Sequence, residues 1–134
     1  MVSLAFQAQE AVQVSVVEDG GFSIMARLLG QDAAVVKQAG ISGITCKVFD
    51  LDSATPTTAT VTPSISAGSN IYDTLQTDAR WTRDSKGYNF RHDAAASICN
   101  VGDHTFLFEY LFDPSSGQDF WLRVRCYAVS VVTS

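Results

Sequence analysis

One stretch near the C-terminal end constrains the fold most, because two apolar segments there flank a single turn. The segments are residues 105–112 and 120–129, and residues 113–119 between them read Asp-Pro-Ser-Ser-Gly-Gln-Asp. Proline fixes φ, glycine permits positive φ, and Asp and Ser side chains hydrogen-bond their own backbone, so this linker favours a chain reversal. We therefore predict a β-hairpin.

The alternation of side chains along this hairpin predicts one buried face and one solvent-facing side. On the first strand, one face carries only aromatic rings: Phe106, Phe108, Tyr110 and Phe112. On the return strand, Leu122, Val124, Cys126 and Ala128 alternate with Trp121, Arg123, Arg125 and Tyr127. Successive strand residues point to opposite faces, so the aromatic set forms a core wall and the arginines lie on the other face of the return strand.

The rest of the chain continues the pattern of short strands. We expect them at residues 3–17, 22–29, 41–49, 54–63 and 88–92, with 54–63 at a sheet edge. Residues 71–75 form a short strand or a turn, and residues 94–98 a helical turn. Residues 76–87 are the least regular part, and Trp81 within them is expected to plug the end of a core. About eight short strands separated by turn signals are typical of an all-β fold, a β-sandwich.

Composition and charge exclude several classes of protein. With 46% hydrophobic and 17% charged residues the chain is not disordered, and no apolar run approaches the roughly 18 residues of a membrane span. A net charge of −5 with nine scattered Lys and Arg residues disfavours a nucleic-acid partner. No signal peptide is expected at the N-terminus. We predict one soluble, globular domain without nucleic-acid or membrane partners.

The histidines and cysteines form no recognisable site. His92 and His104 each adjoin an aspartate, but adjacent strand residues point to opposite faces, so we interpret both as polar strand ends. The three cysteines, Cys46, Cys99 and Cys126, lack metal-like spacing, and their odd number leaves at least one free, which fits a reducing compartment. Cys46 and Cys126 fall on the same face of their strands as the apolar residues, where a thiol behaves as a small hydrophobic side chain.

A group of aspartates suggests calcium binding, but its spacing matches no EF-hand loop. The group is Asp50, Asp52, Asp73, Asp78, Asp84 and Asp93. The sequence also contains no phosphate-binding glycine loop, nucleophile elbow or paired catalytic carboxylates. We therefore expect no catalytic residue, no metal and no cofactor, and predict that the chain is not an enzyme.

The charged face of the return strand is the best candidate for a protein interface. Arg123 and Arg125 stand between Trp121 and Tyr127, a pattern suited to stacking and bidentate pairing. The alternative is a solvated sheet face on which arginine stems cover the aromatics. Further interface candidates are Leu4 and Phe6, in an N-terminal segment whose backbone is suited to adding a strand to a neighbouring subunit.

At the entry into the aromatic strand, Gly102-Asp103-His104-Thr105-Phe106, the chain resembles the Ig-like domains of bacteriophage virion proteins, including baseplate upper proteins. The likeness extends over residues 22–131. It implies an Ig-like antiparallel β-sandwich of about eight strands over residues 18–134, with residues 1–17 as an N-terminal strand or arm. Phe106 replaces the corner tyrosine of many Ig domains, and the inter-sheet cysteine pair with its core tryptophan is absent, which disfavours an antibody-type domain.

The resemblance implies a non-enzymatic structural role on a phage particle, as a capsid decoration or cement protein that acts through protein contacts. The implied partners are the major capsid protein, or tail and baseplate proteins, and further copies of the chain in a homo-oligomer. The implied location is the virion, assembled in the host bacterial cytoplasm. Two alternatives stay open: a tail or baseplate adaptor, and a carbohydrate-binding module in which Trp81, Tyr88 and Trp121 present flat faces to sugar rings.

Overall fold

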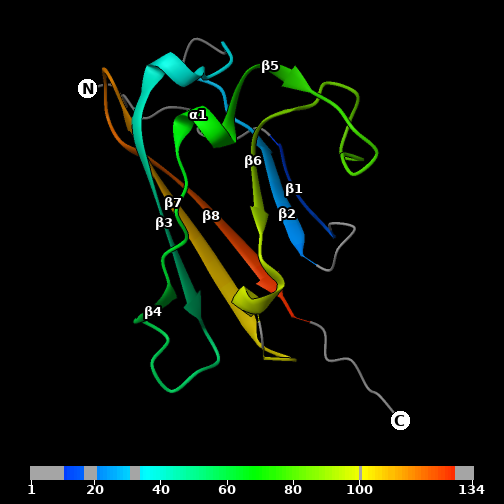
Figure 1. Ribbon diagram of the computed structural model, residues 1–134, viewed down its shortest axis with the longest axis vertical. Coiled ribbons are helices and arrows are strands. Elements are labelled where there is room, and N and C mark those ends of the chain that lie inside the picture. The colour runs from blue at the N-terminus through cyan, green and yellow to red at the C-terminus, as the bar shows by residue number, and fades with distance from the viewer. Residues whose placement is uncertain (1–10, 17–20, 31–33, 100, 129–134) are drawn as a thin grey trace, which may run out of the picture.

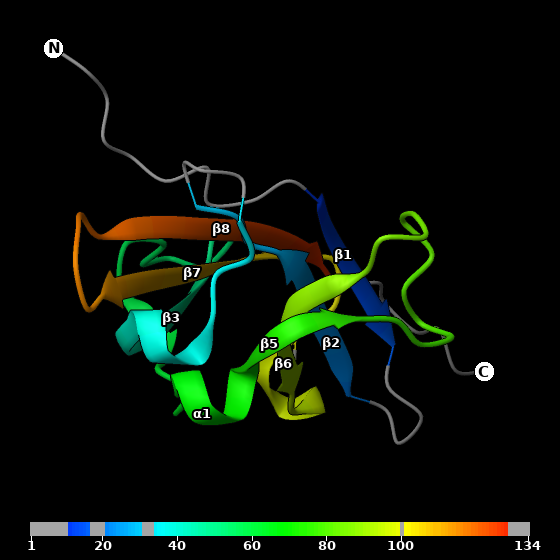
Figure 2. The same ribbon diagram turned by 90° about the horizontal axis from the view of Figure 1, so that it is seen from above.

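The computed structural model consists of two four-stranded antiparallel sheets packed face to face (Figure 1 and Figure 2). It describes residues 11–16, 21–30, 34–99 and 101–128. The first sheet has the strand order β1-β2-β6-β5 and the second has the order β4-β3-β7-β8. The strands are β1 (Ala11–Val16), β2 (Phe22–Arg27), β3 (Ile41–Asp50), β4 (Ala59–Val61), β5 (Ile71–Gln76), β6 (Tyr88–Ala94), β7 (Thr105–Pro114) and β8 (Phe120–Tyr127).

This strand order is that of an immunoglobulin-like sandwich. In the usual lettering, the first sheet corresponds to strands A, B, E and D, and the second to C′, C, F and G. The chain passes from one sheet to the other after β2, after β4 and after β6. The all-β, Ig-like antiparallel sandwich expected from the sequence is therefore confirmed.

The N-terminal strand forms one edge of the first sheet. β1 pairs with β2 from Ala11 opposite Arg27 to Val16 opposite Phe22. Residues 11–16 of the expected strand or arm at 1–17 thus belong to this sheet. The interface candidates Leu4 and Phe6 lie outside the described residues.

The core wall predicted on β7 is confirmed. Phe106, Phe108, Tyr110 and Phe112 are each at most 1% exposed. Across the sandwich, the ring centroids of Phe22 and Phe108 lie 5.4 Å apart, and those of Phe90 and Tyr110 lie 5.0 Å apart, both edge to face. This geometry places the positive edge of one ring on the negative face of the other, which favours each pair beyond the burial of apolar area.

Short helical segments lie at the ends of the sandwich in the described part of the chain: η1 (Gln38–Gly40), α1 (Ala67–Asn70) and η2 (Ala96–Cys99). Figure 1 places α1 at one end and β4 at the opposite end. η2 confirms the helical turn predicted over 94–98. β4 has the predicted edge position but only three residues. α1 lies between β4 and β5, and its N-cap Ser66 accepts a hydrogen bond from the Ser69 N–H at 3.3 Å.

Candidate protein interface

Alternate residues of β3, β7 and β8 build the outer face of the second sheet, which we call the β3–β7–β8 face. The strand register aligns its side chains in rows that cross the strands: Thr45–Leu111–Trp121, Lys47–Glu109–Arg123, Phe49–Leu107–Arg125, and Thr105–Tyr127 on the last two strands. Residues opposite one another on neighbouring strands share a face and contact each other. A charged row therefore lies between two rows that carry apolar side chains.

The alternation predicted along β8 is confirmed. Leu122, Val124 and Cys126 are buried, whereas Trp121, Arg123, Arg125 and Tyr127 are exposed. Trp121 is 43% exposed and Tyr127 is 59% exposed, which is unusual for large aromatic side chains in a small sandwich. The role of these four exposed residues in binding stays a prediction.

Arg123 is held in a defined orientation on this face. Its Nε donates a hydrogen bond to Glu109 Oε2 at 2.8 Å, and its guanidinium carbon lies 4.6 Å from the centroid of the Trp121 ring. The carboxylate and the aromatic ring together orient the half-exposed arginine against Trp121. A partner protein would therefore meet Trp121 and Arg123 already in contact with each other.

Arg125 and Lys47 differ from Arg123 because neither has an acidic partner within the described part of the chain. Both side chains are exposed, Arg125 on β8 and Lys47 on β3. They flank Leu107 and Glu109 of β7, which lie in the same rows. Their donors are available to a molecule that docks on the face.

The outer face of the first sheet, in contrast, is covered over β2 by the chain itself, whereas Asp93 of β6 remains 50% exposed. The loop between β5 and β6 packs Trp81 against Met25 of β2 and Tyr88 of β6. Trp81 is buried as predicted, but it packs on this outer face rather than at the end of the core between the sheets. Figure 1 shows this loop reaching away from β5 before it returns into β6.

An ion pair between the buried Arg27 and the exposed Asp84 anchors the same loop. Arg27 is 4% exposed, and its guanidinium donates to both carboxylate oxygens of Asp84, at 3.1 and 2.9 Å, and to the Gly87 carbonyl at 3.0 Å. These bonds compensate the burial of the Arg27 charge. The Arg27 guanidinium and the Trp81 indole N–H also hold the pKa of the Asp84 carboxyl well below its usual range.

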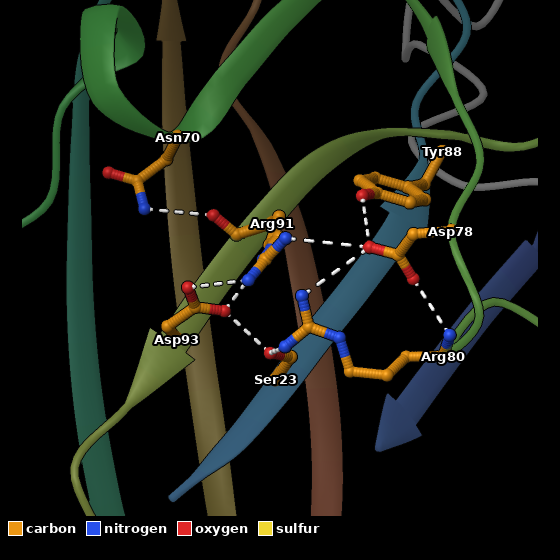
Figure 3. Close-up of polar contacts among 7 residues, drawn as sticks. All are labelled: Ser23, Asn70, Asp78, Arg80, Tyr88, Arg91 and Asp93. Atoms are coloured by element: carbon orange, nitrogen blue, oxygen red, sulfur yellow. Dashed lines mark hydrogen bonds and ion pairs between the residues drawn. The ribbon is translucent and has the colours of Figure 1, made fainter. Parts of the chain in front are cut away.

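A second polar network on this face consists of side chains of the chain that pair with one another (Figure 3). It joins Ser23, Asp78, Arg80, Tyr88, Arg91 and Asp93, and Asn70 donates to the Arg91 carbonyl. Arg91 donates to both carboxylate oxygens of Asp93 at 2.7 and 2.9 Å, and Asp78 accepts from the Tyr88 hydroxyl at 2.9 Å. Two arginines oppose two aspartates, so the network is balanced in charge and fixes the loop to the sheet.

The aromatic residues of the carbohydrate alternative do not form one platform. Trp81 is 5% exposed and Tyr88 is 3% exposed, both against the first sheet. Trp121 lies on the second sheet. Sugar recognition by stacking needs accessible ring faces in one groove, and these three residues do not provide them.

The two histidines have separate partners on different elements. His92 was interpreted as a polar strand end, but it is 6% exposed, and its Nδ1 lies 2.7 Å from the Tyr110 hydroxyl across the sandwich. His104 Nδ1 lies 2.8 Å from a carboxylate oxygen of Asp50. Sequence reasoning missed both pairs because the partners are far apart in sequence, and no local signal marks them.

The cysteines behave as apolar core residues. Cys46 is 1% exposed and Cys126 is 9% exposed, and burial raises the pKa of each thiol to about 12. Cys46, Cys99 and Cys126 are all free thiols in the structure. Among the residues that the structure describes, no group of three or more His, Cys, Asp or Glu side chains is placed to hold a metal ion.

A cleft lies at one end of the sandwich, between the β2–β3 connection and the β7–β8 turn. It has a volume of about 550 Å³. Its lining residues are Gly30, Ala34, Val35, Val36, Lys37, Ala39, Gly40, Ile41, Pro114, Ser115, Ser116 and Phe120. Among the residues that the structure describes, this lining has no carboxylate, imidazole or thiol.

The buried His92 predicts a pH dependence of stability. Burial lowers the pKa of His92, and the neighbouring Asp93 only partly opposes this effect. The unfolded chain, with a histidine pKa of about 6.5, then binds a proton before the folded chain does. The free energy of unfolding should therefore be fully retained above about pH 6.5 and fall as the pH is lowered from there, by at most about 1.4 kcal/mol per pH unit.

Urea denaturation at a series of pH values between about 8 and about 5 measures this dependence. His92→Gln should lower stability at every pH but make the pH profile flatter. His104→Gln is the matched control, because it removes the other imidazole, which is half-buried and bonded to Asp50. An unchanged slope in the His92 variant would contradict the assignment.

Comparisons with known proteins return no relative. No family model matches the sequence, and no curated protein and no solved structure matches the chain. Among the described residues, no helix has the length and apolar character needed to span a bilayer.

Proposed function

We propose that this chain is a non-enzymatic structural protein that binds another protein through the β3–β7–β8 face. The observation that carries the proposal is the difference between the two sheets. Loop 76–87 and balanced ion pairs cover the first sheet, whereas the second exposes Trp121 and Tyr127 beside Arg125 and Lys47, which have no acidic partner in the described residues. Exposed aromatic and arginine side chains are enriched in protein interfaces, and depleted from surfaces that face only water.

We further propose that the protein is a component of a bacteriophage virion, assembled in the host cytoplasm, with capsid decoration as its role. The support is the likeness to phage Ig-like domains together with the Ig-like strand order. A decoration protein gains total affinity by repeating modest contacts around a symmetric shell, which suits one exposed face on a small domain. A tail or baseplate adaptor is the alternative and would use the same face. Self-association into a homo-oligomer is part of the proposal.

The test is binding of the purified full-length chain to capsid shells and to tail fractions of the phage that encodes it, followed by sedimentation. Light scattering on the free chain gives its oligomeric state. Saturable binding to shells supports decoration, and binding to tails alone supports the adaptor. A monomer that binds neither fraction would overturn the virion role.

A substitution at the face should separate binding from folding. Trp121→Ala is expected to weaken particle binding about 30-fold or more, as for a central interface aromatic. Because Trp121 is 43% exposed, the melting temperature should change little. Arg83→Ala is the matched control, since Arg83 is an exposed residue of loop 76–87 on the opposite side of the sandwich. Equal binding by the Trp121 variant and the wild type would exclude this face as the contact.

A further inference from the structure

The charge on the β3–β7–β8 face is opposite in sign to that of the whole chain. The two rows that begin at Lys47 and Phe49 contain Lys47, Arg123 and Arg125 against the single carboxylate of Glu109, which leaves a charge of +2 there. Asp113 near the end of β7 reduces the charge of the whole face to +1. The chain as a whole has a net charge of −5. Three of the nine Lys and Arg residues of the chain thus lie together on the sheet face that loop 76–87 does not cover.

We infer that this face binds an acidic strip of a partner protein, with carboxylates of the partner on Arg125 and Lys47 and apolar side chains between them. This inference rests on the proposed protein-binding function and specifies the partner's chemistry. Glu109 is already engaged by Arg123 at 2.8 Å, so it does not neutralise the two other cations. Arg125 and Lys47 stand on strands about 10 Å apart, on either side of β7, and in neighbouring rows that are two residues apart along the strands. The partner's carboxylates must therefore match a diagonal across the sheet.

The apolar residues between the cations favour a protein over a nucleic acid. Leu107 and Leu111 of β7 are half-buried and lie beside Phe49 and Trp121. A phosphate backbone needs many cations along its length and makes little use of leucine, whereas a protein interface combines an apolar centre with a charged rim. Two unpaired cations on a chain of net charge −5 are too few to hold a polyanion.

A second copy of the same face is also disfavoured as the occupant. In a two-fold contact centred on this face, both copies present the same cations, so Arg125 and Lys47 of one copy would approach Arg125 and Lys47 of the other. Asp103 and Asp113 lie only at the two ends of the face, and the Tyr127 hydroxyl already donates to Asp103 at 3.2 Å. Like charges at the centre would oppose face-to-face association, so a homo-oligomer would use a different surface.

The test uses defined probes on the full-length chain. A short peptide that alternates glutamate and leucine, its lysine–leucine counterpart and a short DNA duplex are titrated while backbone amide NMR shifts are recorded. The acidic peptide should shift amides of β3, β7 and β8 around Lys47 and Arg125, and the other two probes should not. Arg125→Gln with Lys47→Gln, which keeps much of the side-chain stems but removes the charges, should weaken peptide binding about 10-fold or more. Arg83→Gln should leave it unchanged.

The outcomes separate this inference from the proposed function. Equal binding of both peptides would mean that apolar docking alone operates, and binding of DNA at the face would indicate a nucleic-acid partner. Either result overturns the inference, and so do acidic-peptide shifts that are absent or that lie elsewhere in the chain. This holds even if the wild type still binds phage particles. If the acidic peptide binds at the face but no phage fraction does, the virion role fails while the preference for an acidic partner stands.

Discussion

Replacing Phe108 with alanine is expected to lower the free energy of unfolding by about 3 to 5 kcal/mol. The ring is fully buried at the centre of β7, with an edge-to-face contact to Phe22 of the opposite sheet at 5.4 Å. The substitution loses the transfer free energy of the ring, and it leaves a cavity that surrounding strands cannot fill, because their backbones are held by the sheet ladders on both sides.

Urea denaturation followed by tryptophan fluorescence measures this loss. Leu107→Ala is the matched control: the residue is the neighbour on the same strand but faces outward and is only half-buried, so its loss should stay below about 1.5 kcal/mol. Similar losses for the two variants would mean that the assignment of faces on β7 is wrong.

Asn89→Ala is expected to cost about 3 kcal/mol, although the residue is polar. The Asn89 side chain is fully buried and replaces part of the backbone ladder between β2 and β6. Its Oδ1 accepts from the Leu28 N–H at 2.6 Å, and its Nδ2 donates to the carbonyls of Leu28 and Val36 at 3.1 and 2.8 Å. Alanine leaves the buried Leu28 N–H and the half-buried Val36 carbonyl without these partners.

The same substitution at Asn70 is the control for this prediction. Asn70 also donates its amide to a backbone carbonyl, that of Arg91 at 2.9 Å, but it lies near the surface, where water can replace it. We expect Asn70→Ala to cost about 1 kcal/mol in the same urea assay. If Asn89→Ala cost no more than Asn70→Ala, the bridging role of Asn89 would be wrong.

Much of the sandwich was predictable because burial in a strand follows a local rule. The period of two along β7 and β8 separates the buried aromatic wall from the exposed Trp121 and Arg125, and both faces appear as expected. The same rule fails for β2, where Ser23, Met25 and Arg27 are buried although they point away from the core between the sheets. Loop 76–87 covers them, and no pattern within β2 indicates that a distant loop will do so.

The polar pairs could not be predicted from the sequence either. His104 contacts the carboxylate of Asp50, 54 residues away in the sequence, rather than that of the adjacent Asp103. Arg27 pairs with Asp84, which is 57 residues away. Tyr88 and Phe90 are two residues apart on β6, so their side chains would be expected on the same face, yet they pack into different hydrophobic clusters. The backbone turns sharply just before them at Gly87, whose φ of +103° and contact with the Gln76 carbonyl leave no room for a Cβ.

The sequence by itself determined the all-β class, the aromatic hairpin and which residues of β8 face outward, because strand periodicity and turn chemistry act over a few residues. Only the tertiary structure decided which of the two sheets keeps an open outer face. That outcome depends on where loop 76–87 packs and on which acids neutralise which bases, and both are set by contacts between residues far apart in the chain. Lys47 and Arg125 became candidates for one binding surface only when β3, β7 and β8 were seen side by side.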